Sequence, residues 1–237
     1  MAVSVDTVYQ RVLALANKEQ RGYITPQEFN LFADQAQMEI FEQYFYDLNQ
    51  FKRRPGNDTK YADLGDLIEE KMSIFKAITE ISNEQLLSAL PDFYRLGRVW
   101  STDYSVDPDK RDQVIVEKTT LENVVVEALG PLTKSTNRRP VYRIDTNMIR
   151  INPAVNPTGP YFCSYVKKPI KPSWGYVVVN DKPLYNSNAS TDFELHSSEE
   201  SELVYRTLAY AGIAIEKPQL TQTAMGLEGA KVQQEKQ

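Results

Sequence analysis

The sequence contains only one cysteine, Cys163, and only one histidine, His196, among its 237 residues. A single cysteine excludes a disulfide bond within the chain and a zinc site built from several cysteines. A single histidine excludes a three-histidine metal centre and the two-histidine helix motif of metalloproteases. Because no nucleotide-binding motif is present either, the sequence predicts a protein without a metal or another cofactor.

Long apolar runs are also missing. The longest uncharged and mostly apolar stretch covers 208–215, far short of the ~20 residues that cross a bilayer. The N-terminus lacks the charged start and apolar segment of a signal peptide. We therefore expect a soluble protein that resides inside a cell or in a virus particle. The net charge of -5 argues against a protein that coats DNA or membranes nonspecifically.

Recognisable catalytic motifs are absent as well. The sequence has no phosphate-binding loop of the Walker A type and no nucleophile elbow. His196 stands before a helix start with acidic neighbours, which is more typical of a capping or surface residue than of a catalytic base. Cys163 lies inside an apolar strand segment and is expected in the core. We therefore do not expect an enzyme.

The N-terminal part has helical spacing of its apolar residues. One helix is predicted over 3–18. A second begins at the Thr-Pro-Gln-Glu segment Thr25–Glu28, a capping box with proline at the first helical position, and its apolar face continues to Phe51. A short helix is expected over 64–72. The apolar residues of 75–81 fit a helix or a strand equally well.

Residues 17–28 imitate a calcium-binding loop, with Gly22 and Glu28 at loop positions 6 and 12. Position 5, however, is Arg21, a cation where an oxygen ligand is required. A helix that ends at Gly22 and another that begins at Thr25 explain the same residues. We therefore do not expect calcium binding.

From residue 91 onward the pattern changes to short segments in which aromatic and β-branched residues alternate with polar ones, which predicts strands. Asp145-Thr146-Asn147 joins two of these segments at hairpin spacing. The predicted strands are 93–100, 114–117, 124–126, 141–144, 148–151 and 161–166. Further on, Ser197–Glu200 is a second capping box and starts another helix.

These patterns predict an α+β fold. We expect the N- and C-terminal helices to form a helical bundle into which an antiparallel β lobe is inserted. The expected parts are a mainly helical region at 1–90, the β lobe at 91–183, a linker and a C-terminal helix packing on the N-terminal helices at 184–216, and a polar tail at 217–237 that becomes ordered on a partner.

The segment 131–175 is strongly basic, with eight basic residues and one acidic residue, Asp145. Aromatic residues are interleaved, so the segment suits either nucleic acid or an acidic protein surface such as that of another copy. We favour a protein partner. The interface residues predicted by this argument and by the tail are Arg138, Arg139, Arg143, Arg150, Lys167, Lys168, Lys171, Glu199, Glu200, Glu202, Leu220, Met225 and Leu227.

Three stretches together carry a family resemblance. They are VYQRVLALANKEQRGYITPQEFNLFADQAQ at 8–37, RPVYR at 139–143 through KKPIKPSW at 167–174, and FELHSSEESELV at 193–204, which leads into Ala211-Gly212. This set resembles virion proteins of tailed bacteriophages, especially the head-to-tail connector (adaptor or ring) proteins of short-tailed and crAss-like phages.

The resemblance implies a homo-oligomeric ring of about twelve copies under the portal protein, closed by head-to-tail contacts. Such a ring extends the DNA channel, lets genomic DNA pass without sequence-specific binding, and attaches further tail or ring proteins. The implied location is the head–tail junction of the virion, after assembly in the host cytoplasm. Alternatives are another virion protein, either capsid-associated or cargo, a nucleic-acid-binding module that uses 131–175, and a wall hydrolase.

Overall fold

The computed structural model describes residues 2–16, 24–53, 62–107, 110–136, 138–153, 160–214 and 218–235. The chain divides into two compact units. The helical unit combines Met1–Ile74 with Pro169–Gln237, and the sheet unit is Phe75–Lys168. The expected α+β fold, a helical bundle with an inserted β lobe, is confirmed.

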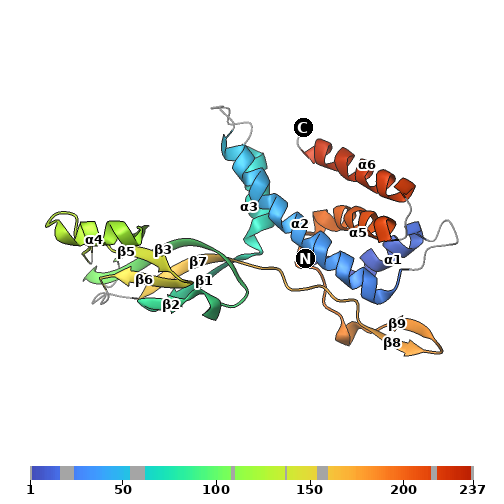
Figure 1. The fold of residues 1–237 in the computed structure, drawn as a ribbon, viewed down its shortest axis with the longest axis horizontal. Coiled ribbons are helices and arrows are strands. Elements are labelled where there is room, and N and C mark those ends of the chain that lie inside the picture. Colours follow the sequence, from blue (N-terminus) through green and yellow to red (C-terminus); the bar gives the residue numbers. More distant parts are fainter. Residues whose placement is uncertain are drawn as a thin grey trace. The chain divides into compact units, whose positions relative to one another are not determined.

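The helical unit is built around α5 (Glu200–Ala214), which packs against three other helices. These helices are α1 (Val5–Ala16), α2 (Pro26–Arg53) and α6 (Pro218–Glu235), and α3 (Ala62–Ser73) packs on α2 (Figure 1). Apolar side chains of these helices face inward at helical spacing, which buries one continuous core. The core includes Val5, Val8, Val12, Phe29, Ala33, Ile40, Phe41, Leu203 and Leu208.

The start of α2 follows the sequence prediction. The backbone N–H of Thr25 donates to the Glu28 carboxylate at 2.9 Å, and the backbone N–H of Glu28 donates to Thr25 Oγ1 at 3.3 Å. The hydrogen bond from the Thr25 backbone, helped by the Thr25 hydroxyl, lowers the pKa of Glu28. The predicted capping box is therefore confirmed. The calcium-loop positions 17–23 lie outside the described residues.

The sheet unit contains a seven-stranded sheet in the order β1-β7-β3-β4-β5-β6-β2. Neighbouring strands are antiparallel except for the parallel pair β4 and β5. Val99, Val116, Ile149 and Cys163 form part of its core. The strands are β1 (Lys76–Ile81), β2 (Glu84–Leu86), β3 (Phe93–Asp107), β4 (Lys110–Lys118), β5 (Val141–Asp145), β6 (Met148–Asn152) and β7 (Tyr161–Lys167).

The predicted hairpin at residues 145–147 is confirmed, because Asp145 pairs with Met148. Thr146 and Asn147 have φ angles of 42° and 69°. Two consecutive residues with positive φ form the type of two-residue turn that matches the twist of antiparallel strands. The segment 75–81, which fitted a helix or a strand equally well, contains strand β1.

One predicted strand is wrong. Residues 124–126 lie in helix α4 (Leu121–Leu129). The Thr120 hydroxyl caps this helix by accepting a hydrogen bond from the Asn123 backbone N–H at 3.3 Å. Three consecutive valines favour a strand by propensity. Here the Thr120 cap marks a helix start, and Leu121, Val125 and Leu129 recur at the four-residue spacing of a helix.

The boundaries of the sheet unit differ from those expected for the β lobe, 91–183. The unit begins at Phe75 because β1 and β2 complete the sheet. It ends at Lys168 because the following segment packs on the helical unit. There Trp174 is buried, and its indole N–H donates to Asp6 Oδ1 in α1 at 2.9 Å.

The C-terminal segment also differs from the expected polar tail. Residues Pro218–Glu235 form helix α6, which lies against α5 of the same chain. That a partner orders this segment stays a prediction. Within the part of the chain that the structure describes, no helix has the length and apolar character needed to cross a membrane.

Candidate functional site

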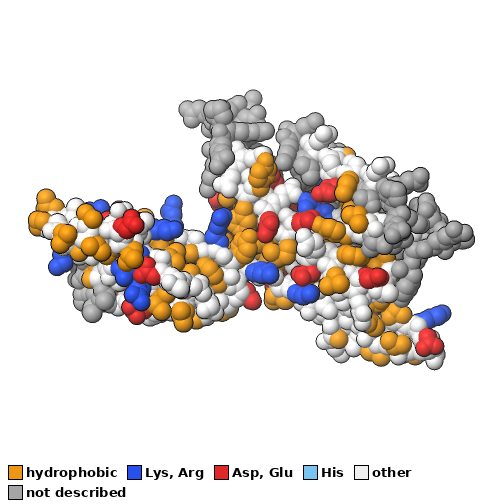
Figure 2. Space-filling model, in the orientation of Figure 1, with side chains coloured by type: hydrophobic (Ala, Val, Ile, Leu, Met, Phe, Trp, Pro, Cys, Tyr) orange, Lys and Arg blue, Asp and Glu red, His pale blue; other side chains and the backbone are white. Residues whose placement is uncertain are grey.

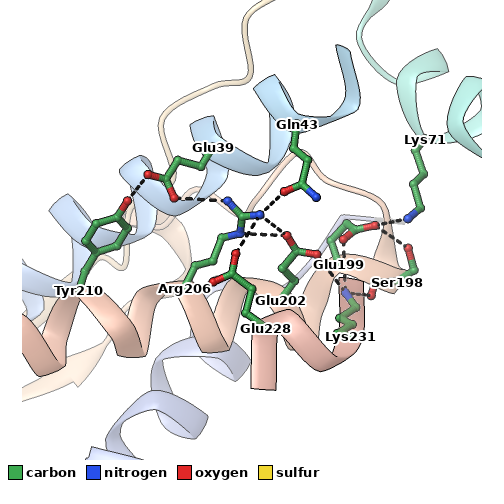
Figure 3. A network of polar contacts seen from close by, with 10 residues as sticks. All are labelled: Glu39, Gln43, Lys71, Ser198, Glu199, Glu202, Arg206, Tyr210, Glu228 and Lys231. Atoms are coloured by element: carbon green, nitrogen blue, oxygen red, sulfur yellow. Dashed lines mark hydrogen bonds and ion pairs between the residues drawn. The ribbon is translucent and has the colours of Figure 1, made fainter. Parts of the chain in front are cut away.

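A network of polar side chains connects four helices of the helical unit (Figure 3). Its members come from α2, α3, α5 with the turn before it, and α6. They are Glu39, Gln43, Lys71, Ser198, Glu199, Glu202, Arg206, Tyr210, Glu228 and Lys231. The network is the most extensive arrangement of buried charge that the described residues display.

Glu199 is the centre of one half of this network, and its side chain is only 1% exposed. Lys71 Nζ lies 2.5 Å from Oε1, and Lys231 Nζ lies 3.4 Å from Oε2. The Ser198 hydroxyl donates to Oε1 at 3.0 Å. Burial opposes ionisation of Glu199, but Lys71, Lys231 and the Ser198 hydroxyl outweigh it and lower the pKa of the carboxyl group. Glu199 is therefore held as a carboxylate.

Arg206 is the centre of the other half. Its guanidinium lies 2.6 Å from Glu202, 3.2 Å from Glu228 and 3.3 Å from Glu39, and it also donates to Gln43. Burial disfavours the charged form, but these three carboxylates outweigh it and raise the pKa of Arg206. Arg206 thereby joins α2, α5 and α6.

The two halves meet at Glu202, whose side chain is 3% exposed. Burial, with the neighbouring charge of Glu199, raises the pKa of Glu202 even though Arg206 and Lys231 favour its ionised form. At the far end of the network, the Tyr210 hydroxyl donates to Glu39. Burial of Tyr210 and this hydrogen bond raise its pKa to about 12. The network matches buried carboxylates with cations from other helices, and this arrangement holds the helices in register.

Two of the three predicted acidic interface residues, Glu199, Glu200 and Glu202, are therefore not at the surface. Glu199 and Glu202 are buried in the network and cannot face a partner in this arrangement. Glu200 is partly exposed and pairs with Arg11 of α1 at 2.6 Å. The expectation failed because the sequence does not show which cations from distant segments reach these acids.

His196 caps the short helical turn Ser197–Glu199 that leads into α5. Its Nδ1 accepts a hydrogen bond from the Ser198 backbone N–H at 3.3 Å. The interpretation of His196 as a capping residue is thus confirmed. The predicted capping box at 197–200 begins one residue too late, because the cap is the imidazole rather than a serine hydroxyl.

The predicted basic interface residues are divided between the two units. Lys171 belongs to the helical unit and pairs with Asp34 at 3.5 Å. The others lie in the sheet unit, where Arg139 pairs with Glu117 at 3.3 Å and Arg143 pairs with Asp145 at 2.6 Å. Segment 131–175 is therefore not one continuous element of a single unit.

Four further basic residues of the sheet unit complete this set. Arg150 lies 3.8 Å from Glu84 and 4.0 Å from Asp145. Arg138 and Lys168 are exposed, and Lys167 is partly exposed. Much of the local positive charge is thus balanced by acids of the same unit, including Glu84 and Glu117, which lie outside the basic segment.

Four of the five aromatic residues of the basic segment are buried, and the fifth, Phe162, is half-buried. Tyr142, Tyr161 and Tyr165 belong to the core of the sheet unit, and Trp174 is buried in the helical unit. Bases stack only on aromatic faces that they can reach. These four rings therefore offer no stacking platform.

Two apolar surfaces are exposed instead, and sequence reasoning missed both (Figure 2). On α4, Leu121, Val125 and Leu129 follow each other at four-residue spacing and are exposed, with Leu129 at 82%. Leu132, just beyond the helix, is 93% exposed. Solvated side chains of this kind on one helix face are typical of a surface that another molecule covers.

The second apolar surface is the hairpin of β8 (Tyr176–Val179) and β9 (Lys182–Tyr185). Val177, Val178, Val179 and Leu184 are all exposed on it. The sequence signal for this hairpin is Asn180-Asp181 between two segments with β-branched or aromatic residues. Both residues have positive φ in the two-residue turn.

The predicted anchors of the C-terminal segment lie on α6. Met225 and Leu227 are exposed there, at 53% and 44%. Leu220 is also in α6, but its side chain is outside the described set. Among the α6 side chains that the structure describes, Ala224 is buried.

Among the residues that the structure describes, no group of three or more histidine, cysteine or acidic side chains is arranged to hold a metal ion. Cys163 is buried in the sheet core, as predicted, and burial raises the pKa of its thiol to about 11. Comparison with models of known protein families finds no match, and comparison with curated proteins finds none either.

Proposed function

We propose that this chain is a structural subunit of a virus particle. More specifically, it forms a head-to-tail connector ring that docks under the portal protein, extends the DNA channel and attaches the tail. The proposal combines the resemblance to connector proteins with the exposed apolar side chains on α4 and on the β8–β9 hairpin. It assigns the chain no catalytic role.

The observation that carries the proposal is the exposure of large apolar side chains on both units. Leu129 on α4 is 82% exposed and Val178 on the hairpin is 61% exposed. Burying such groups at an interface contributes roughly 25 cal/mol for each Å² of apolar area removed from water. In an assembly, neighbouring subunits would cover these side chains, which explains why these positions are apolar.

A nucleic-acid-binding module is the alternative function, and the structure supports it less well. Four of the five aromatic rings of the basic segment are buried, and Arg139 and Arg143 are paired with acids. Exposed Arg138 and Lys168 are compatible with DNA passing nearby without base recognition.

Electron microscopy of the purified full-length protein, alone and with the portal protein of the same particle, tests the proposal. We expect closed rings of about twelve copies, because head-to-tail contacts close into a ring at a suitable rotation. A chain that remains monomeric in both preparations at all concentrations would overturn the proposal.

A further inference from the structure

We propose that the β8–β9 hairpin of one subunit docks the exposed apolar side chains of its strands into a groove between α1 and α5 of a second copy of this chain. The inference rests on the proposed function, because it names the contact by which subunits assemble. Both surfaces belong to the helical unit, so the contact needs no particular placement of the sheet unit.

The hairpin is anchored at its root, and its strands carry exposed apolar side chains. The indole of Trp174 packs on the rings of Tyr176 and Tyr185, with ring centroids 5.9 and 5.8 Å apart. Beyond this root, Val177, Val178 and Leu184 are exposed. A two-stranded hairpin is only marginally stable in water by itself, and its apolar side chains gain stability when a third surface covers them.

The groove lies on the helical unit and has a volume of about 320 Å³. It is lined by Arg11, Ala14 and Leu15 of α1 and by Ser201, Val204 and Tyr205 of α5. Leu15 is 38% exposed there, although it lies beside the buried core residue Ala16. The lining thus offers aliphatic and aromatic surface to an apolar side chain.

A subunit cannot fill its own groove with its own hairpin. Trp174, at the root of the hairpin, is bonded to Asp6 of α1. Leu15 follows Asp6 by nine residues, which at about 100° per residue places it on the opposite side of the helix. Four-residue strands reach only about 13 Å, too short to pass around a helix about 10 Å wide. Figure 1 shows the hairpin pointing away from α5.

The charges of the two surfaces match. The hairpin turn carries an acid and a base in sequence, Asp181 and Lys182, both exposed, and Figure 2 shows one acidic and one basic side chain at the end of the hairpin. Beside the groove, Arg11 and Glu200 form an ion pair at 2.6 Å, with side chains 55% and 30% exposed. An entering turn can pair Asp181 with Arg11 and Lys182 with Glu200, so no charge is left uncompensated.

The hairpin and the groove are different surfaces of the helical unit, so their pairing between copies is a heterologous contact. Each copy then offers one hairpin to the next subunit and one groove to the previous one, and such a series closes into a ring when the rotation allows. A hairpin that paired with another hairpin would give only a symmetric dimer.

Two single substitutions and their mixture test this contact. Val178→Glu disables the hairpin and Leu15→Glu disables the groove. Each variant alone should need at least a tenfold higher concentration to assemble, as is typical for loss of a central interface residue. Their equimolar mixture retains one intact hairpin and one intact groove, so sedimentation velocity should show heterodimers that grow no further.

Leu31→Glu is the matched control, because Leu31 is 62% exposed in the same unit but belongs to neither surface. It should assemble like the wild-type protein. Circular dichroism melting of all variants checks that they are folded.

Each outcome decides the proposal. Rings that persist in both variants would overturn the contact and leave the proposed function standing. Loss of assembly in Val178→Glu alone, with no heterodimer in the mixture, would indicate hairpin–hairpin pairing and would also overturn it. A wild-type chain that stays monomeric, alone and with the portal protein, would overturn the proposed function and this contact together.

Discussion

Lys231 near the end of α6 places its ammonium group 3.4 Å from the buried carboxylate of Glu199. The two residues are 32 positions apart in the sequence, and their contact joins the last helix to the start of α5. Ala224 of α6 is buried, whereas Met225 and Leu227 of the same helix are exposed. Ion pairs are thus among the contacts that join α6 to the bundle.

Lys231→Gln should loosen α6. Loss of the ammonium group leaves Glu199 with Lys71 as its remaining cation, and Glu202 with Arg206. We expect faster backbone hydrogen exchange throughout 218–235, with little change in α2. Lys182→Gln removes the same charge from an exposed position and should leave this exchange unchanged. Equal hydrogen-exchange rates of 218–235 in the wild type and in Lys231→Gln would show that the ion pairs of Lys231 do not hold α6 on the bundle.

Arg206→Met tests the other half of the network. The substitution leaves the buried carboxylate of Glu202 without its nearest cation, and removal of one partner of a buried ion pair costs about 3–5 kcal/mol. We expect the midpoint of urea unfolding to fall accordingly. Arg11→Met breaks the more exposed pair with Glu200 and should cost less than about 1 kcal/mol. A similar loss of stability in both variants would mean that the buried ion pairs of Arg206 stabilise the protein no more than the exposed pair of Arg11 does.

The parts of the fold that the sequence predicted are those specified by neighbouring residues. The Thr25–Glu28 capping box and the turn at Thr146-Asn147 each depend on a few consecutive positions, and both were predicted correctly. The strand predicted at 124–126 failed because its three valines were given more weight than the Thr120 cap. A local pattern thus predicts an element correctly when the capping or turn residues at its ends are considered together with its apolar residues.

The network could not be predicted in the same way. Glu39, Arg206 and Lys231 are far apart in the sequence, and only the packing of α2, α5 and α6 brings them together. The acids at 199–202 were visible, but a helix start rich in acids has the same appearance whether it faces solvent or buried cations. Burial decided the role of these residues, and burial is a property of the assembled bundle.

Trp174 provides an optical test of the conclusion that the aromatic residues of segment 131–175 do not bind bases. In a Trp100→Phe variant, Trp174 is the only tryptophan. Because it is buried, its emission should resist quenching by iodide and should not change when single-stranded oligonucleotides are added. Trp174→Phe, which retains the half-buried Trp100, is the comparison. Quenching of Trp174 emission by oligonucleotides would revive the nucleic-acid interpretation.

Cys163 should be chemically inert in the folded protein. At a pKa of about 11, only on the order of 0.1% of the thiol is ionised at pH 8. We expect Ellman's reagent to label it only as the protein unfolds in urea, whereas a cysteine introduced by Leu132→Cys should react at once. Rapid labelling of the native wild-type protein would contradict the burial of Cys163.

The same thiol predicts a pH dependence of stability. Its pKa is raised from 9.0, so the folded state holds this proton more tightly than the unfolded state does. The contribution to stability is complete below pH 9 and is lost as the pH rises through 11. The midpoint of urea unfolding should fall between pH 9 and pH 11. The rate of Cys163 labelling should rise over the same pH range.

We propose that the protein resides at the head–tail junction of a virus particle. Immunogold labelling of purified particles, intact and with the tail removed, tests it most directly. We predict label at a single vertex, which becomes stronger once removal of the tail exposes the connector. Label distributed over the whole shell would contradict the account and would indicate a capsid-associated protein instead.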